Sequence, residues 1–392
     1  MLIITLLKGV PARTTQVVEV GGVLNREAMD IVLNPHDAKA IEAADFVKRK
    51  VGGKVVALSM GPDMKLIPIM KPLFDAEVFG VDEQCVLSDR KMAGSDTLAT
   101  SYAVSLGVKK VVERHTAAID ELIAAVKKDG YSDALLAKAS SLYASNLLPN
   151  RVYSSLPSVH DTIIQRFMSG VLSAEAATAE LKAVRASLER YIVVSGVKTT
   201  DGETGSVGPQ VSEGVTELTG TVVPHATYVE DFDIDEASGT VVAARRLGFF
   251  LQTVEMRLPA LLTVYEAYRP REVPASRQPE VRLNNYKGKV LQVIKWTADD
   301  LAADAKRLGF LGSPTIVGPG IDIGKPAVQK VLGKTLVFLR RVDAIEQEGS
   351  RVGPFDKGDV ASGLPPALVE RLRAEGALGA FDYPMLMEDL FP

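Results

Sequence analysis

Short apolar runs alternate with amphipathic segments over the first hundred or so residues. Residues 2–7, 54–59 and 84–88 are apolar runs bounded by turn or helix signals, a pattern typical of strands buried on both faces of a sheet. Between them, Pro35 to Lys50 and Asp63 to Phe74 carry apolar residues at helical spacing. This alternation predicts an α/β fold with a doubly wound, mostly parallel sheet.

A fourth apolar strand, Tyr191 to Ser195, follows the third only after a long interval. The stretch from about 112 to 188 is rich in Ala, Leu, Lys and Ser at helical spacing, so we interpret it as a helical insertion. Beyond residue 220, apolar and polar residues alternate in several segments, which predicts an antiparallel or mixed extension of the sheet. After about residue 326 the pattern is less regular and ends in the apolar and acidic stretch FDYPMLMEDLFP.

Composition narrows the possible classes of protein. With 46% hydrophobic and 24% charged residues, the chain is expected to bury a core without disulfides or metals. A formal charge of -4 offers no broad positive field, so nucleic acid is not an expected partner. The only cysteine, Cys85, excludes an internal disulfide, is expected to be a buried structural thiol and fits a cytoplasmic location. No metal-ligand spacing occurs among the four histidines, and no apolar run approaches the roughly 20 residues of a membrane span.

The fourth strand leads into a loop rich in glycine and threonine, followed by a predicted helix. Gly202, Gly205 and Gly208 allow backbone amides to turn inward, while Thr204 and Ser206 offer hydroxyl groups. The start of the next helix presents unpaired N–H groups, so the loop can hold a phosphate. It matches neither the Walker A pattern nor the dinucleotide fingerprint, so a plain surface loop is the alternative.

A turn at Asn34 and Pro35 leads into a helix predicted to begin around His36. Asp37 near that helix start suits the helix dipole. On these residues alone, a capped helix without a ligand role is the simpler interpretation.

The third strand also opens into a glycine-containing loop, and a helix is predicted to start near Asp96. The carboxyl ends of parallel strands are where open α/β sheets bind ligands. Thr97 and Thr100 at this helix start either contact a nucleotide or cap the helix.

Six segments occur in the order and approximate spacing of one family: LNPHDAKAIEAA, VVALSMGP, LSDRKMAGSDTLATSYA, DGETGSVGPQ, RLPALLTV and FLGSPT. Over about residues 1–110 and 189–320, the chain resembles the electron-transfer flavoprotein β subunit. The resemblance implies an adenine nucleotide held between the first strand, the Asn-Pro turn, the Ser-x-Gly-Pro loop and the glycine-rich loop, with the DTLAT helix start towards the flavin side. The cofactor-binding residues that it implies are Leu6, Asn34, Pro35, His36, Asp37, Met60, Asp96, Thr97, Thr100, Asp201, Gly202, Glu203, Thr204, Gly205, Ser206, Val207, Gly208, Pro209, Gln210, Val211 and Ser212.

Members of this family differ in the nucleotide that they hold. Single-flavin members hold AMP as a structural ligand, whereas electron-bifurcating members hold a second FAD that exchanges hydride with NADH. The stretches from Asp201 to Thr204 and from Val207 to Gln210 resemble the FAD-binding pattern, so the resemblance favours FAD over AMP. No catalytic residue is predicted, because in an electron carrier the cofactor supplies the chemistry.

The resemblance also implies a heterodimer with an electron-transfer flavoprotein α subunit. Further expected partners are an acyl-CoA-type dehydrogenase or another oxidoreductase, and ferredoxin if the flavin bifurcates electrons. The alternatives are an AMP-holding carrier and a non-redox adenine-nucleotide-binding regulator that needs no α subunit.

Three parts depart from the family pattern. Gly196-Val197-Lys198 stands where the family has Gly-Lys-Gln or Gly-Arg-Gln, and Tyr268 to Arg271 matches only in part. The insertion at 112–188 serves a partner or is a passive surface addition. We predict a nucleotide-binding domain at 1–325 and an arm at 326–392 that docks a subunit or partner.

Overall fold

The structure, a computed structural model, describes the chain in segments. The described residues are 1–12, 19–20, 23–24, 30–74, 80–129, 132–144, 151–152, 160–271, 292–315, 346–347 and 350–351. The chain divides into two compact units, Met1–Gly320 and Ile321–Pro392. In the second unit the described residues form one strand pair, β16 (Glu346–Gln347) with β17 (Ser350–Arg351), and the rest of the predicted docking arm lies outside the described residues.

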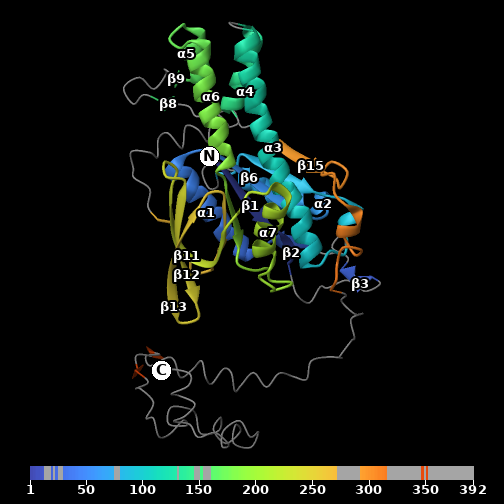
Figure 1. The fold of residues 1–392 in the computed structure, drawn as a ribbon. Coiled ribbons are helices and arrows are strands. Elements are labelled where there is room, and N and C mark those ends of the chain that lie inside the picture. The colour runs from blue at the N-terminus through green and yellow to red at the C-terminus, as the bar shows by residue number, and fades with distance from the viewer. Residues whose placement is uncertain are drawn as a thin grey trace, which may run out of the picture. The chain divides into compact units, whose positions relative to one another are not determined.

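A nine-stranded sheet forms the centre of the first unit, in the order β13-β12-β11-β14-β10-β1-β6-β7-β15 (Figure 1). Its parallel strands are β1 (Leu2–Leu7), β6 (Lys54–Met60), β7 (Glu83–Leu87), β10 (Ile192–Gly196), β14 (Ala260–Val264) and β15 (Gln292–Trp296). Residues of β1, β7 and β14 are buried throughout, as expected for strands covered on both faces. The four apolar strands predicted from the sequence are confirmed.

The predicted mixed extension is also present. It consists of β11 (His225–Asp235), β12 (Thr240–Leu247) and β13 (Phe250–Arg257). β11 pairs parallel with β14 and antiparallel with β12, which pairs antiparallel with β13. Tyr228 has a φ of 57° where the register of β11 shifts. The shift lets one strand serve both the parallel and the antiparallel part of the sheet.

The other elements connect or cover these strands. The helices are α1 (Pro35–Val51), α2 (Asp63–Met70), α3 (Thr97–Asp129), α4 (Asp133–Ala144), α5 (Ile163–Met168), α6 (Ala174–Glu189) and α7 (Val207–Thr219), with short 3-10 turns at Lys71–Phe74, Arg90–Met92 and Ala305–Arg307. Short antiparallel pairs join β2 (Gly9–Pro11) to β5 (Ile31–Leu33), β3 (Glu19–Val20) to β4 (Val23–Leu24), and β8 (Arg151–Val152) to β9 (His160–Asp161).

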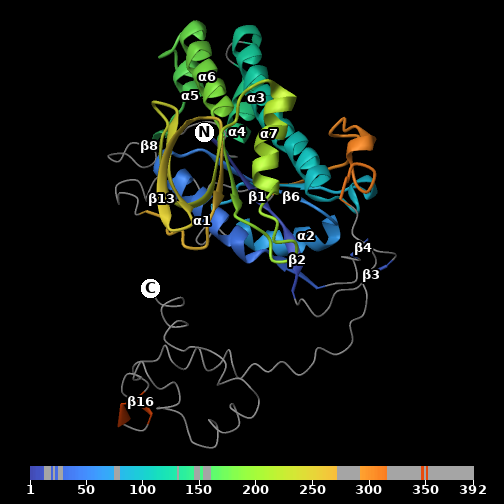
Figure 2. The same cartoon turned by 60° about the horizontal axis from the view of Figure 1, so that its bottom comes forward.

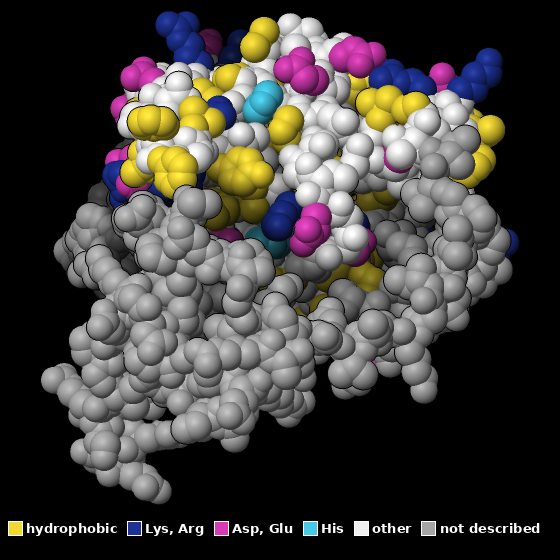
Figure 3. All heavy atoms as spheres, turned by 90° about the horizontal axis from the view of Figure 1, so that it is seen from below, with side chains coloured by type: hydrophobic (Ala, Val, Ile, Leu, Met, Phe, Trp, Pro, Cys, Tyr) yellow, Lys and Arg dark blue, Asp and Glu magenta, His cyan; other side chains and the backbone are white. Residues whose placement is uncertain are grey.

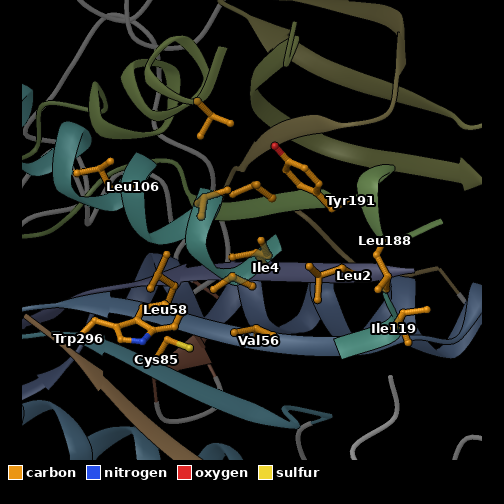
Figure 4. Packing of buried hydrophobic residues seen from close by; sticks show 14 of the residues in the cluster. Leu2, Ile4, Val56, Leu58, Cys85, Leu106, Ile119, Leu188, Tyr191 and Trp296 are labelled. Carbon is orange, nitrogen blue, oxygen red and sulfur yellow. The ribbon is translucent and has the colours of Figure 1, made fainter. Parts of the chain in front are cut away.

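Two hydrophobic cores lie on opposite faces of the parallel strands, because successive side chains of a strand point to opposite sides. On one face, Leu2, Ile4, Val56 and Leu58 pack with residues of α3, α6 and α7, and Figure 4 shows Ile119 among them. On the other face, alternate residues of the same strands pack with α1, α2 and the β11–β13 extension. Cys85 is fully buried in the first core, which confirms the predicted structural thiol.

The described residues of the stretch predicted to be an insertion are largely helical, but no element boundary falls at residue 112. α3 runs unbroken from Thr97 to Asp129, so one helix belongs to both the sheet cover and the insertion. α6 packs beside its distal half, and Arg185 of α6 pairs with Asp120 of α3 at 2.8 Å. In both ribbon views the distal part of α3 stands with α4, α5 and α6 at one end of the sheet (Figures 1 and 2).

The strand order reverses between β1 and β10. From β1 the chain proceeds to β6 and β7 on one side, and later returns to place β10 on the other side of β1. Ligands of open α/β sheets bind at the carboxyl ends of the strands flanking such a reversal. The topology therefore predicts a ligand site in the loops that follow Leu7 and Gly196.

Candidate functional site

Most of the residues expected at the site come together at the carboxyl edge of the parallel strands. Leu6 lies near the end of β1 and is in register with Ser195 of β10, while Met60 ends β6. The starts of α3 and α7 meet the same edge, because they follow the parallel strands β7 and β10. The start of α1 follows β5, outside the large sheet, and is held at this edge by the hydrogen bond from Lys8 N–H to Asp37. Val211 and Ser212 are exceptions, since they lie on the buried face of α7 and are 0% exposed.

Asp37 binds the ends of the two strands that flank the reversal. Its carboxylate accepts the Lys8 N–H at 2.7 Å and a hydrogen bond from the Gly196 N–H. A Cβ on Gly196 would lie 2.5 Å from Asp37 Oδ1, so this approach requires glycine. Burial raises the pKa of Asp37 to about 7 against the lowering effect of these hydrogen bonds.

Asn34 holds the glycine-rich loop from the other side. Its side-chain amide donates to Lys198 O at 2.9 Å, and its Oδ1 accepts the Thr200 N–H at 3.3 Å. It makes no side-chain capping bond to α1, although it stands at the cap position. The Asn-Pro turn expected from the sequence thus acts on a loop more than 160 residues away in the chain.

The loop itself turns through left-handed backbone at two places. Glu203 has a φ of 51° and Gly205 a φ of 63°. Ser206 makes no side-chain capping bond, so the N–H groups of the first turn of α7 face the loop without that cap. Such a helix start favours an anion.

Gly208 allows α7 to approach the sheet closely. A Cβ at this position would lie 2.5 Å from Thr263 Cγ2 and 3.2 Å from Ser195 Oγ. Ser195 Oγ and Gln210 Oε1 are buried atoms without a hydrogen-bond partner in the described part of the molecule. Buried polar atoms normally have partners, so these two atoms keep hydrogen-bonding capacity that the described residues do not use.

Two lysines bring positive charge to the loop. Lys8 Nζ lies 2.7 and 2.8 Å from the two carboxylate oxygens of Asp201. Lys198 Nζ lies 3.6 Å from Glu203. Neither Lys8 nor Ser195 was expected from the sequence; the signals were a cation directly after the first strand and a hydroxyl ending the fourth.

Asp96 caps α3, so its neighbours Thr97 and Thr100 do not have to serve as the helix cap. Its carboxylate accepts the N–H groups of Leu98 and Ala99 at 2.9 and 3.0 Å. It also accepts the Thr315 N–H at 3.1 Å, which fastens the FLGSPT segment to this helix start. Burial works to raise the pKa of Asp96, but these backbone hydrogen bonds outweigh it and lower the pKa. Since Asp96 is the cap, the partly exposed side chains of Thr97 and Thr100 are not required for capping.

Among the residues described, no group of three or more His, Cys, Asp or Glu side chains is placed to hold a metal ion. Within the same residues, no helix is long and apolar enough to cross a membrane.

Comparisons with known proteins point to one family. Residues 21–119 match the electron transfer flavoprotein domain. The chain is 26% identical over 320 residues to the electron transfer flavoprotein subunit beta of Thermoanaerobacterium thermosaccharolyticum, covering 81% of this chain and 86% of the relative. It is 27% identical over 336 residues to the subunit of that name in Clostridium acetobutylicum, covering 83% and 93%. Protein FixA of Bradyrhizobium diazoefficiens is 25% identical over 321 residues, covering 80% of each chain. The matched domain and these relatives support the electron-transfer flavoprotein β family for this chain.

Proposed function

We propose that this chain is the β subunit of a heterodimeric electron-transfer flavoprotein and that it holds FAD at the carboxyl edge of β1 and β10. One observation carries the proposal: the strand order reverses where a glycine-rich loop and the uncapped start of α7 meet. Sheets of this kind bind dinucleotides at such reversals, with phosphate at a helix start. A Rossmann-like mode of binding is part of the proposal.

The residues present fit the chemistry of an adenine dinucleotide. The backbone of residues 202–206 and the first turn of α7 would hold the phosphates, because Gly208 brings that turn close to the sheet. Ser195 and Gln210 each offer a buried polar atom without a partner, and Leu6 and Met60 offer apolar contact. A flavin held here would supply hydride exchange with NADH and transfer of single electrons to other carriers. The chain itself would bind, orient and shield it.

FAD is proposed in preference to AMP because of the loop. The Asp-Gly-Glu-Thr and Val-Gly-Pro-Gln stretches resemble the pattern of FAD-binding members. The hydroxyl groups of Thr97 and Thr100, which are not needed to cap α3, extend the polar edge from the loop towards the start of that helix. A longer ligand than AMP suits this extended edge.

A second subunit is proposed to cover the same edge. Met64 at the start of α2 is 83% exposed, and Leu311 beside the start of α3 is 80% exposed. Leu98 and Phe310 are also exposed there, and Figure 3, which views this end, shows hydrophobic side chains on its surface. Apolar groups gathered around a ligand edge are typical of an interface. The α subunit is the partner proposed for this surface, with electrons passing between NADH or an acyl-CoA-type dehydrogenase and the partner flavin or ferredoxin.

A cytoplasmic location belongs to this proposal, and the single buried thiol Cys85 agrees with it. A non-redox adenine-nucleotide-binding regulator is the second candidate, because the backbone of the loop would also hold the phosphates of AMP or ATP; the preference for FAD rests on the residue pattern of the loop and the extended edge. The regulator needs no second subunit, so the two candidates separate on purification.

The test is to purify the native complex, denature it, and measure its subunits and released nucleotides. The proposal predicts a yellow heterodimer with two FAD, one of them assigned to this chain. One FAD with one AMP would make the chain an AMP-holding carrier. A colourless homo-oligomer with ATP would contradict the flavoprotein function.

A further inference from the structure

The Asp201 carboxylate accepts hydrogen bonds from donor groups that are suited to binding a phosphate. Both of its oxygens lie within 2.8 Å of Lys8 Nζ. Its Oδ1 also accepts the Gly202 N–H at 2.8 Å. The side chain of Asp201 is only 10% exposed, while that of Lys8 is 36% exposed, so the carboxylate lies inside the loop and the lysine reaches it from the rim.

An ammonium group and a backbone N–H at the head of a glycine-rich loop are the donors that phosphate oxygens use. Here the carboxylate of Asp201 accepts hydrogen bonds from both donors. A phosphate cannot share these donors with an ionised carboxylate without repulsion between two anions at close range. Binding therefore requires Lys8 to leave Asp201.

We propose that Asp201 is an internal placeholder for a phosphate group, and that a phosphorylated ligand binds by taking Lys8 away from it. This inference rests on the proposed function, because it concerns the same site. It changes the role of Asp201 from the contact residue implied by the family resemblance to a competitor of the ligand. Lys8 becomes the phosphate-binding cation, directly after the strand where the sheet order reverses.

A placeholder has a consequence that a contact residue does not have. Removing a contact weakens binding, whereas removing a competitor strengthens it. The energy of a partly exposed ion pair is modest, so the gain is expected to be about twofold to fivefold in affinity. The gain must also depend on Lys8.

The test measures binding of inorganic pyrophosphate and of ADP to the full-length chain after its nucleotide has been removed. Asp201→Asn keeps the size and the acceptor for Gly202 but removes the charge. We expect it to bind both probes about twofold to fivefold more tightly than the wild type. Lys8→Gln should bind both more weakly, and the double variant should behave as Lys8→Gln alone. Asp201→Ser is a second variant with the same expectation as Asp201→Asn.

Asp120→Asn is the matched control, because Asp120 pairs with Arg185 at 2.8 Å far along α3. It should leave the affinity for both probes unchanged. Unchanged or weaker pyrophosphate binding by Asp201→Asn and Asp201→Ser would overturn the placeholder. Loss of ADP affinity alone would make Asp201 a ribose contact and would also overturn it. If the wild type binds no adenine nucleotide at all, the proposed function fails instead.

Discussion

Glu83 lies fully buried at the amino ends of β6 and β7, among the side chains of Lys54, Arg114 and His115. Lys54 Nζ lies 2.8 Å from its carboxylate. At the carboxyl ends of β1 and β10, by contrast, polar atoms of Ser195 and Gln210 lie buried without partners. The first set of charges joins α3 to the sheet through ion pairs, although Glu83 Oε2 and His115 Nε2 also make no hydrogen bond of good geometry among the described residues. The second set consists of uncharged polar atoms whose hydrogen-bonding capacity is unused. Charges that neutralise one another inside the fold indicate a structural cluster, whereas unused uncharged polar atoms beside a glycine-rich loop favour a binding site.

The largest effect is expected from Glu83→Gln. It leaves Lys54 and Arg114 near each other without the buried carboxylate, so the free energy of unfolding should fall by about 3–5 kcal/mol. Burial works to raise the pKa of Glu83, but His115, Lys54 and Arg114 together lower it. The stabilisation is therefore present above the unfolded pKa of about 4.3 and is lost on acidification below it.

Urea denaturation at pH 7 and pH 3.5 checks this prediction. The difference between the wild type and Glu83→Gln should shrink at the lower pH. The folded variant should still bind nucleotide, because Glu83 lies at the other end of the strands. A loss below 1 kcal/mol at pH 7 would mean that the cluster is not structural in the sense proposed.

Gly208→Ala tests the carboxyl edge, with a somewhat smaller effect on stability. The new Cβ would meet Thr263 Cγ2 at 2.5 Å, so α7 must move away from the sheet. We expect a loss of about 1–3 kcal/mol and a clear loss of bound nucleotide. Glu213→Ala is the control, because it places the same alanine side chain on the exposed face of the same helix. Equal nucleotide content in both variants would contradict the role of Gly208.

Asp37→Asn tests the hydrogen bonds by which Asp37 links the ends of β1 and β10, through the pH dependence of stability. Because burial raises the pKa of Asp37 to about 7, the folded state holds a proton that the unfolded state loses near pH 4. Stability of the wild type should therefore fall as the pH rises from about 4 to 7. The variant lacks this slope, so thermal unfolding measured across that range should show the two curves diverging. Parallel curves would show that Asp37 ionises at its ordinary pH.

The smallest effect on the site is expected from shortening the insertion. Replacing residues 130–173 by a short linker keeps the α3–α6 pair, which Asp120 and Arg185 join. Nucleotide content should not change, although some stability is lost with α4 and α5, which bury residues such as Leu135 and Phe167. Unchanged electron transfer to every native partner would make the insertion a passive addition, and loss towards one partner would identify its docking role.

Elements set by local pattern could be predicted, whereas contacts set by tertiary structure could not. The apolar strands and the start of α1 follow from periodicity and from the Asn-Pro turn. The continuity of α3 through residue 112 was missed, because a helical pattern carries no mark where the helix leaves the sheet. Likewise, Asp96 rather than its threonine neighbours proved to cap α3.

At the site, the glycine-rich loop was recognisable, but its partners were not. Lys8 and Asp201 are separated by 193 positions, and Asn34 and Lys198 by 164. Only the pairing of β1 with β10 brings them together. Which residues would contact a ligand directly stays a prediction.

Hydrogen exchange of the nucleotide-loaded and nucleotide-free chain tests the central claim most directly, because it compares both ends of the sheet in one measurement. The account predicts added protection in the loop at 197–206 and at the starts of α1 and α7, with no change in α3 beyond Arg114. Protection confined to the insertion, or none at the loop, would contradict it.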